Sequence, residues 1–543
     1  MKNNHLLLWI LVLAFAVLAS IPWLIPHTGA VALIAFIPLL FAEDIATQLK
    51  IKHFWIWHYS AFVLWNAFTT FWVCNATVGG GVFAVLANAL QMSVIFGIFR
   101  LSRKRFTGVI PYIFLAAAWI AWEHLYFNAQ ISWPWLTLGN AFAQTTRLVQ
   151  WYEYTGSLGG SLWIWAANLG IYGVLVALAD GCWQRWNHLG RIAAAVAVTL
   201  VIGGPVLASY AIYNRYEEKS EGTVDVLIGQ PNFDPYHKFE AMTQAQQTQY
   251  LLDLYDEALE ARTDSSALLL LAPETFTSDI LLDDVNASAT MQSFKEFLTR
   301  HKGCELLFGA STYDVYTTHA APTILAYPRG YGWLVSHNSA LITDAEGNHD
   351  IYHKSKLVVG TELTPYPKLF VKLDNLICSL FKIHGPLMGR CVGQDGVSLL
   401  HFNGDVPIGC AVCYESVYGE YCTGYVRKGA KAMTVITNDA WWGNTPGYRQ
   451  HFSYSRLRAI ELRRDFARCG NTGLSAVIDQ RGDVLTCGPW WEPCTLRGTV
   501  NLNSEQTFFS RYGDMTGRVC IFVFLLLAAL LIVKLFIPTD KLR

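Results

Sequence analysis

Three short segments of the sequence each place a chemically reactive side chain at or near the end of a hydrophobic run. Glu274 follows the apolar residues 267–271, Cys413 follows residues 406–412, and Lys354 lies in a Tyr-His-Lys segment. A carboxylate at the edge of a buried sheet loses hydration, which raises its pKa toward that of a useful general base. A lysine can stabilise a developing oxyanion, and a cysteine thiol can attack a carbonyl carbon. The three residue types together predict acyl-transfer chemistry.

Each of these residues also has an ordinary structural interpretation. Glu274 is compatible with a solvated loop, Lys354 with a surface strand, and most free cysteines are inert core residues. Lys356 competes with Lys354, and spacing alone does not decide between them. Cys410 and Cys413 have the C-x-x-C form, but the pair stands alone, so the sequence indicates no zinc site and gives little support to a redox dithiol.

The composition indicates a membrane protein. Of the 543 residues, 53% are hydrophobic and only 15% are charged, whereas soluble chains average nearer a quarter charged. The formal net charge is −1. This balance leaves no basic surplus for nucleic acid, so no nucleic-acid partner is expected.

Eight segments are apolar and long enough to cross the hydrocarbon core of a bilayer, which takes about 18 residues of helix. They are residues 6–24, 29–46, 54–74, 82–99, 111–127, 162–182, 192–213 and 519–537. The first is too long for the apolar region of a cleavable signal peptide, and another span follows at once. The predicted organisation is a seven-span region at residues 1–214, a polar domain at 215–518, and a C-terminal transmembrane helix with a short tail at 519–543.

Lysine and arginine in the short loops predict the orientation. Lys50 and Lys52 follow the second span, and four basic residues at 100–105 follow the fourth, whereas the alternate loops offer only Arg147. Cytoplasmic loops carry the excess of positive charge. The N-terminus is therefore expected in the cytoplasm and the polar domain outside it.

The polar domain alternates strand-like and helical segments. The strand-like runs are residues 224–229, 267–271, 305–309, 340–343, 397–402 and 433–437, and the helical ones include 244–262 and 290–301. This alternation predicts an α/β sheet packed under helices. At roughly 300 residues such a domain can bury its own core.

The order and surroundings of the reactive residues resemble the nitrilase superfamily and, within it, the bacterial apolipoprotein N-acyltransferases. The resemblance starts with three motifs: Pro273-Glu274, Tyr352-His-Lys354 followed by Glu362, and Cys413-Tyr414-Glu415. It extends to Thr437-Asn-Asp-Ala-Trp441-Trp-Gly443, Gln450-His-Phe452, Arg458-Ala-Ile-Glu461, Trp133-Pro-Trp-Leu-Thr-Leu-Gly139 and Thr155-Gly-Ser-Leu-Gly-Gly160. It therefore covers nearly the whole chain, and its register selects Lys354 over Lys356.

The resemblance implies an α-β-β-α sandwich attached to a multi-span helical bundle, with Glu274, Lys354 and Cys413 as catalytic triad. The implied reaction moves a fatty acyl chain from a membrane phospholipid, through a Cys413 thioester, to the α-amino group of a diacylglyceryl-cysteine that begins an apolipoprotein. The implied place is the bacterial inner membrane, with the catalytic domain on the periplasmic side. No metal or dissociable cofactor is expected.

Supporting or substrate-binding roles are implied for six further residues, with Glu362 and Glu415 expected to orient the lysine and shape the site. The six are Glu362, Glu415, Tyr414, Phe239, Asn338 and Trp441. The chain departs from the family pattern where Phe239 and Ala272 stand in place of tryptophan, and where Val-Val-Gly-Thr precedes Glu362. These departures leave the triad intact and bear on substrate contacts.

Residues 365–389, between the lysine and cysteine motifs, are unusually apolar, with leucines and phenylalanines at helix-like spacing. Such a segment is either an arm that enters the membrane interface or a helix packed on the sheet. Because nine cysteines lie in the polar domain and an extracytoplasmic compartment is oxidising, a disulfide is also expected, with Cys378 and Cys391 as the favoured pair.

Two other functions remain open on the residues alone. A membrane-anchored amidase or nitrilase acting on a small soluble substrate would need one anchor, not eight spans. A transporter would place ionisable groups inside its spans, and Glu43, Asp44 and Glu123 are the few candidates.

Overall fold

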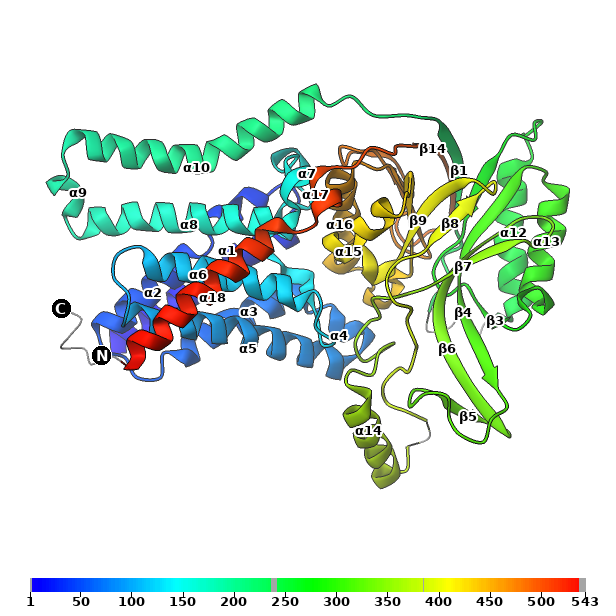
Figure 1. Ribbon diagram of the computed structural model, residues 1–543, viewed down its shortest axis with the longest axis horizontal. Coiled ribbons are helices and arrows are strands. Elements are labelled where there is room, and N and C mark those ends of the chain that lie inside the picture. The colour runs from blue at the N-terminus through cyan, green and yellow to red at the C-terminus, as the bar shows by residue number, and fades with distance from the viewer. Residues whose placement is uncertain (1, 236–241, 384, 537–543) are drawn as a thin grey trace.

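The computed structural model describes residues 2–235, 242–383 and 385–536. An elongated bundle of helices is joined end-on to an α/β domain (Figure 1). The start of α1 (Lys2–Leu24) and the end of α18 (Met515–Phe536) lie together at the end of the bundle farthest from that domain. The chain thus leaves the bundle once, after α10 (His188–Arg215), and returns to it with α18.

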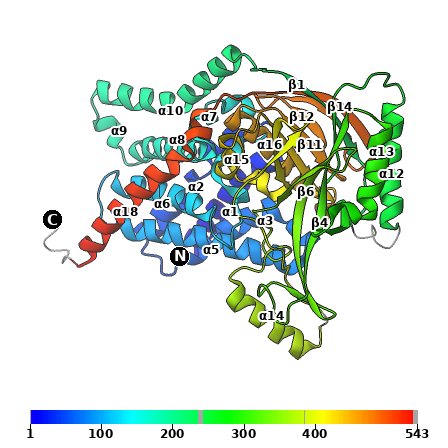
Figure 2. The ribbon, with the colours of Figure 1, turned by 45° about the vertical axis from the view of Figure 1, so that its right-hand side comes forward.

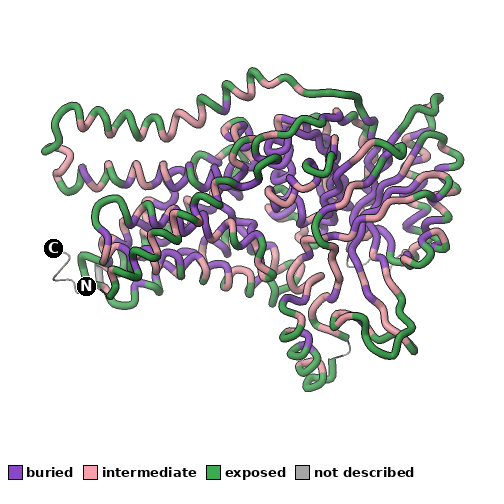
Figure 3. Tube along the Cα trace, viewed as in Figure 1, coloured by how far each residue is buried: buried purple, intermediate pink, exposed green. Residues whose placement is uncertain are grey.

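Long apolar helices build the bundle. Besides α1, α10 and α18, its helices are α2 (Ile37–Gln48), α3 (Trp55–Thr70), α4 (Val73–Ala76), α5 (Val78–Arg103), α6 (Ile110–Tyr126), α7 (Tyr152–Thr155), α8 (Ser157–Ala179) and α9 (Cys182–Arg185). Among the described residues, six helical stretches are long and apolar enough to cross a membrane. The exterior of α10 and α18 is largely exposed (Figure 3), as suits helices whose apolar side chains face lipid.

Two of the eight predicted spans are shorter than expected. The segment 54–74 breaks after Thr70, so α3 has 16 residues, and α6 has 17. At about 1.5 Å per residue each still extends roughly 25 Å, and both pack inside the bundle, α3 against α1 and α5, and α6 against α18. The prediction of about eight helices is approximate for this reason.

Glu43 and Asp44 of the bundle pair with arginines, whereas the buried Glu123 accepts hydrogen bonds from the Trp119 indole and the Leu138 amide. Glu43 is 1% exposed and pairs with Arg100 at 3.2 Å and with Arg103. Asp44 pairs with Arg103 at 2.7 Å. Buried charges of opposite sign at such distances serve packing and orientation, so these residues give no support to a transport pathway.

The α/β domain contains two stacked sheets. The first has the order β14-β1-β2-β4-β6-β5, with β3 added to β4 and β7 to β6, and the second has the order β13-β12-β11-β10-β9-β8. The first sheet comprises β1 (Thr223–Gln230), β2 (Leu268–Leu271), β3 (Thr277–Leu281), β4 (Cys304–Tyr316), β5 (Tyr327–Arg329), β6 (Gly332–Thr343), β7 (His349–His353) and β14 (Cys494–Asn501). The second comprises β8 (Leu399–Phe402), β9 (Val406–Val412), β10 (Ala432–Thr437), β11 (Phe466–Gly470), β12 (Ala476–Ile478) and β13 (Val484–Cys487).

Helices cover the outer faces of both sheets. One buried cluster joins Leu269 of β2 to Val435 of β10 across the two inner faces. A second cluster packs α12 (Gln244–Leu259) and α13 (Ala289–Arg300) on the outside of the first sheet. With α15 (Gly419–Arg427) and α16 (Pro446–Leu462) against the second sheet, the layers form the expected α-β-β-α sandwich (Figures 1 and 2). Each predicted strand segment overlaps an observed strand, and both predicted helices are present.

Helix α16 forms buried hydrogen bonds that hold the α/β domain against the bundle. Gln450 accepts a hydrogen bond from the Trp135 indole at 2.7 Å and donates to the carbonyl oxygens of Trp23 and Thr69 at 3.2 and 3.1 Å. These bonds are buried, where an unpaired polar group is costly. The domain is therefore fixed on the bundle through specific polar contacts.

The apolar segment 365–389 forms a helix, α14 (Pro367–Phe381), that projects from the domain (Figures 1 and 2). Only Val371 and Asp374 of this helix are buried, while Leu369, Leu376 and Leu380 are more than half exposed. The helix is therefore an extended arm with an uncovered apolar face, and the alternative of a helix packed on the sheet is wrong.

The predicted Cys378–Cys391 disulfide is wrong, because both residues are free thiols. The Cys378 thiol, in the last turn of α14, donates to the Gly385 carbonyl oxygen at 3.2 Å. Cys391 lies beside β6, where its sulfur is 3.8 Å from the Ser336 hydroxyl. The two residues face different neighbours because the arm carries Cys378 away from the sheet.

Candidate active site

Glu274 is held at the carboxyl end of β2. All four residues of this strand are buried, since it pairs in parallel with β1 on one side and β4 on the other. The turn after it packs against Gly309 of β4, where an added Cβ would lie 2.5 Å from the Glu274 Cα. Only glycine permits this approach, so the strand and the glycine together fix the carboxylate at the end of the sheet.

Lys354 lies directly beside this carboxylate. It follows β7, is 1% exposed, and its ammonium is 2.9 Å from Glu274 Oε1 and 3.0 Å from Glu362. Asn338 of β6 donates to both carboxylates, at 2.8 Å to Glu274 and 2.6 Å to Glu362. Two carboxylates therefore flank one ammonium, and an amide bridges them. Asn338 and Glu362 thus contact the residues they are expected to support.

Burial and neighbouring charge oppose each other at Lys354. Removal from water disfavours the ammonium, but the negative charges of Glu274 and Glu362 outweigh this effect and raise the pKa of Lys354 well above its usual range. The side chain is consequently a fixed positive charge. This is the property that oxyanion stabilisation requires.

Cys413 begins a tight turn, η6 (Cys413–Val417), after β9. Its φ of 51° is rare outside glycine and marks a strained position of the kind found at functional sites. The residue is half-buried. Burial raises the pKa of the thiol well above its usual range, the charge of Glu274 raises it further, and the charge of Lys354 opposes the rise. The thiol therefore rests protonated within reach of both charges.

Glu415 fixes the cysteine turn to the lysine segment. It is fully buried and accepts hydrogen bonds from the backbone amides of Val412 at 2.9 Å, Ser355 at 2.8 Å and Lys356 at 3.1 Å. The Tyr352 hydroxyl also donates to it, at 2.5 Å. Glu415 thus joins the backbones on either side of the site, whereas Glu362 contacts the lysine ammonium itself.

The other sequence candidates lie at different distances from the triad. Tyr414 is buried, stacks on Trp133 and donates to the Ser132 carbonyl oxygen at 3.1 Å, so it connects the cysteine turn to the bundle. Trp441 is 40% exposed in the turn after β10. Phe239 lies outside the described residues. Lys356 points away from Glu274, because its ammonium bonds the Phe127 carbonyl oxygen at 3.2 Å.

A second polar network supports the cysteine from behind. His451 of α16 donates from Nε2 to the Cys413 carbonyl oxygen at 3.1 Å, while its Nδ1 lies 2.8 Å from Asp439. Arg468 of β11 donates to the same carboxylate at 2.7 Å. All three side chains are 0% exposed. Burial favours the neutral acid, but Arg468 and His451 lower the pKa of Asp439 to about 2.

The motifs that resemble the family include Asp439 and His451, but the resemblance implies no role for either residue. The usable signal was an aspartate shortly after the apolar run 432–437 and a histidine in the Gln450-His-Phe452 motif. Arg468, inside strand β11, gave no signal distinguishable from an ordinary core position.

The chain matches two protein-family models. Residues 179–508 match the family model described as carbon-nitrogen hydrolase, which is more than half of the chain. The chain belongs to the carbon–nitrogen hydrolase family. Residues 9–170 of this carbon–nitrogen hydrolase match a second model, the apolipoprotein N-acyltransferase N-terminal domain. The resemblance seen in the sequence is thereby confirmed over both parts.

Curated relatives match this carbon–nitrogen hydrolase over nearly its whole length. An apolipoprotein N-acyltransferase of Chlorobaculum tepidum is 28% identical over 92% of this chain and 91% of its own. One from Geobacter metallireducens is 25% identical over 93% and 91%. Among solved structures, Saccharomyces cerevisiae Nit3, of the nitrilase superfamily, covers 55% of this chain and 97% of its own at 13% identity and a TM-score of 0.37.

Proposed function

We propose that this membrane enzyme transfers a fatty acyl chain from a membrane phospholipid to the α-amino group of the diacylglyceryl-cysteine at the N-terminus of apolipoproteins. The observation that carries the proposal is the union of two matches in one chain. The α/β domain belongs to the carbon–nitrogen hydrolases, and the bundle matches the N-terminal domain of apolipoprotein N-acyltransferases.

The first half-reaction forms a thioester. As the Cys413 sulfur bonds to the ester carbonyl carbon, Glu274 takes the thiol proton, which the raised thiol pKa makes necessary. The Lys354 ammonium stabilises the tetrahedral oxyanion. Collapse breaks the carbon–oxygen bond of the ester, and Glu274 returns its proton to the departing lysophospholipid hydroxyl. The acyl chain is then bound to sulfur.

The second half-reaction forms the amide. The α-amino group of the acceptor attacks the thioester carbonyl, Glu274 accepts a proton from the nitrogen, and Lys354 again faces the oxyanion. Collapse releases the Cys413 sulfur, which recovers the proton from Glu274. Every proton transfer uses one carboxylate, so neither half-reaction requires a metal ligand or a dissociable cofactor.

The arm α14 supports a lipid substrate. Its exposed face carries Leu369, Leu376 and Leu380 beside Phe381, which is 73% exposed, as in helices that lie in a membrane interface. Because the wild-type chain already has 20 tryptophans, its emission serves as the reference. We expect brominated phospholipid in vesicles to quench an additional component of the emission in the Leu376→Trp variant. If the added indole is not quenched, α14 does not enter the bilayer.

The proposed orientation places the catalytic domain on the periplasmic side of the bacterial inner membrane. It is supported by the basic loops, since Arg100 and Arg103 lie at the end of α5 while the domain adjoins the opposite end of the bundle (Figure 1). Cys487 is exposed on the domain. It should react with a membrane-impermeant maleimide once the outer membrane is opened. Reaction only after the inner membrane is disrupted would reverse the topology.

Accumulation of the thioester tests the reaction itself. With phospholipid and no acceptor, intact-protein mass spectrometry should show one added acyl chain that neutral hydroxylamine removes. A diacylated lipopeptide should remove it as well, with release of the N-acylated product. Wild-type protein that turns over both substrates without ever carrying this adduct would contradict the covalent route. An adduct from a small amide but never from phospholipid would favour the amidase alternative.

A further inference from the structure

A cavity of about 700 Å³ opens where the bundle meets the α/β domain. Phe127 and Asn128, just beyond α6, line it on the bundle side, and Lys356, Arg427 and Lys428 line it on the domain side. None of Glu274, Lys354 and Cys413 is among its lining residues. The cavity is therefore separate from the candidate active site.

Lys356 presents a half-buried ammonium to this cavity and forms no ion pair with a carboxylate of the described residues. Its hydrogen bonds go to neutral oxygens, the Phe127 carbonyl at 3.2 Å and the Asn128 side chain at 3.4 Å. The rings of Tyr418 and Tyr421 lie 5.2 and 5.7 Å away. Burial lowers the pKa of Lys356, and the charges of Glu415 and Glu420 oppose this effect. An anion in the cavity would complete its coordination.

Arg427 and Lys428, at the end of α15, repeat this pattern. Arg427 donates to the Ser510 carbonyl oxygen at 3.4 Å and Lys428 to the Val397 carbonyl oxygen at 2.5 Å. In the part of the chain that the structure describes, neither residue forms an ion pair, and neither does Lys356. Three cations thus converge on one cavity, and the side-chain hydrogen bonds that they donate among the described residues go to neutral oxygens.

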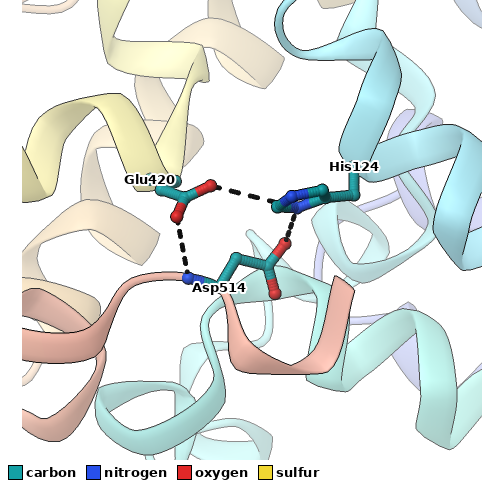
Figure 4. Close-up of side chains that lie close together, drawn as sticks. All are labelled: His124, Glu420 and Asp514. Atoms are coloured by element: carbon teal, nitrogen blue, oxygen red, sulfur yellow. Dashed lines mark hydrogen bonds and ion pairs between the residues drawn. The ribbon is translucent and has the colours of Figure 1, made fainter. Parts of the chain in front are cut away.

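The two carboxylates whose charges act on Lys356, Glu415 and Glu420, are already engaged. Glu415 accepts hydrogen bonds from the backbone amides of Val412, Ser355 and Lys356. Glu420 lines the cavity, but it accepts from Arg518 at 3.2 Å and from the backbone amide of Asp514 at 3.1 Å. Its second oxygen lies 3.9 Å from His124, which also pairs with the Asp514 carboxylate at 2.7 Å (Figure 4). The remaining acid of the cavity, Asp395, is exposed. The lining thus carries three cations and two carboxylates, and one of these carboxylates already pairs with Arg518.

The same contacts indicate the level of the membrane at which the cavity lies. Asp514 immediately precedes α18, and His124 lies in the last turn of α6 (Figure 4). Two helices of the bundle thus end beside Glu420, on the side of the domain. Helix ends of membrane spans lie at the level of the lipid headgroups. The three cations are consequently placed where lipid phosphates are.

We propose that this cavity binds the phosphodiester of a membrane glycerophospholipid, at a site distinct from the one that cleaves the acyl ester. The Arg427 guanidinium suits two phosphate oxygens at once, and the two ammonium groups suit a third. Phe127 and Val397 offer apolar contact for the glycerol carbons. The inference goes beyond the proposed acyl transfer, because lipid binding at this site requires only that the cavity lies at the membrane surface. It involves no chemical reaction.

Binding of an ether-linked phosphatidylglycerol to the full-length protein in detergent tests the site. This lipid has no ester and cannot acylate Cys413, so occupancy is measured apart from turnover. Native mass spectrometry should show one tightly bound lipid that an Arg427→Gln/Lys428→Gln variant loses. At about 1 kcal/mol for each cation at a lipid surface, affinity should fall about fivefold per charge removed. Asp395→Asn should strengthen the same binding.

A charge-matched variant controls for general electrostatics. Arg300 and Lys302 are exposed near the end of α13, on the far side of the domain, so Arg300→Gln/Lys302→Gln should bind the lipid like wild type. Lipid affinity that is equal in both double variants and the wild type would overturn the site. Inorganic phosphate and glycerol phosphate, titrated as competitors, identify the source of the phosphate. Weak competition supports a lipid, and phosphate that binds tightly by itself would overturn the lipid assignment.

Discussion

Two networks of buried charged residues meet at Cys413, and they differ in how far their side chains are exposed to solvent. Glu274 and Lys354 act on the thiol through their charges, and Glu362, whose side chain keeps 17% of its surface exposed, pairs with Lys354. Asp439, His451 and Arg468 hold the backbone behind it and are 0% exposed. We call the first the thiol network and the second the backbone network.

Their charge balance differs as well. The thiol network sets two carboxylates against one ammonium, so one carboxylate remains available to receive a proton. The backbone network encloses a single carboxylate between a guanidinium and an imidazole, which keeps Asp439 ionised. The comparison indicates that a carboxylate can accept a proton where neighbouring cations neutralise only part of the negative charge. A carboxylate whose charge is fully neutralised by its neighbours serves as a structural support.

The largest effects should follow from breaking the thiol network. Cys413→Ala, Glu274→Gln and Lys354→Met should each lower acyl transfer about a thousandfold or more, as in other catalytic groups that act as a unit. Lys356→Met should cost at most about tenfold, since its ammonium faces the cavity beyond α6. Phospholipid-dependent acylation of a lipopeptide measures all four. If Lys356→Met lowers acyl transfer as much as Lys354→Met does, the choice of Lys354 over Lys356 as the catalytic lysine is wrong.

Breaking the backbone network should have an intermediate effect. His451→Ala removes the donor to the Cys413 carbonyl oxygen and releases a strained turn, so kcat should fall about ten- to a hundredfold with little change in KM. His451→Gln keeps an N–H donor and should recover part of the rate. A variant that raises KM for phospholipid at unchanged kcat would place His451 in substrate binding instead.

The sequence predicts the thiol network because its members follow regular strands. Glu274 follows an all-apolar strand and Cys413 follows another, so hydrophobic runs made them candidates. The family resemblance then selected them, and with them Lys354 over Lys356. The backbone network joins α16, β11 and the turn after β10, which only the tertiary packing brings together. Local pattern carries no information on such contacts.

The helical bundle and α14 also have features that the local sequence does not predict. Apolar runs predicted the spans, but the break after Thr70 depends on how α3 packs. The amphipathic pattern of α14 predicted a helix and left open whether protein or lipid covers its face. Cys378 and Cys391 are close in sequence, yet the arm separates their surroundings. Spacing restricts which cysteines can approach, and the path of the chain decides whether they do.

Titration of the Cys413 thiol should separate the two networks. Burial and then Glu274 raise its pKa, whereas Lys354 lowers it. Glu274→Gln should therefore lower the thiol pKa and speed alkylation by iodoacetamide near pH 8 by about tenfold, although acyl transfer is lost. Lys354→Met should slow alkylation. Peptide mass spectrometry follows Cys413 among the other cysteines.

The matched control for that titration is Asp439→Asn. Asp439 raises the thiol pKa less than burial and Glu274 do, so its removal should change the alkylation rate far less than Glu274→Gln. An equal change in both variants would mean that the two networks act on the thiol as one, and the distinction between them would fail.

The smallest effect concerns acid stability and belongs to the backbone network alone. The pKa of Asp439 is about 2 in the folded protein, below its ordinary value of 3.8. A depressed carboxyl pKa adds stability that is complete above pH 3.8 and is lost as the pH falls through about 2. The shift corresponds to about 2 kcal/mol, or a few degrees in Tm for a domain of this size. The Tm gap between wild type and Asp439→Asn should thus be constant above about pH 5 and narrow toward pH 2. A gap that stays constant to pH 2 would show that Arg468 and His451 do not stabilise the ionised carboxylate.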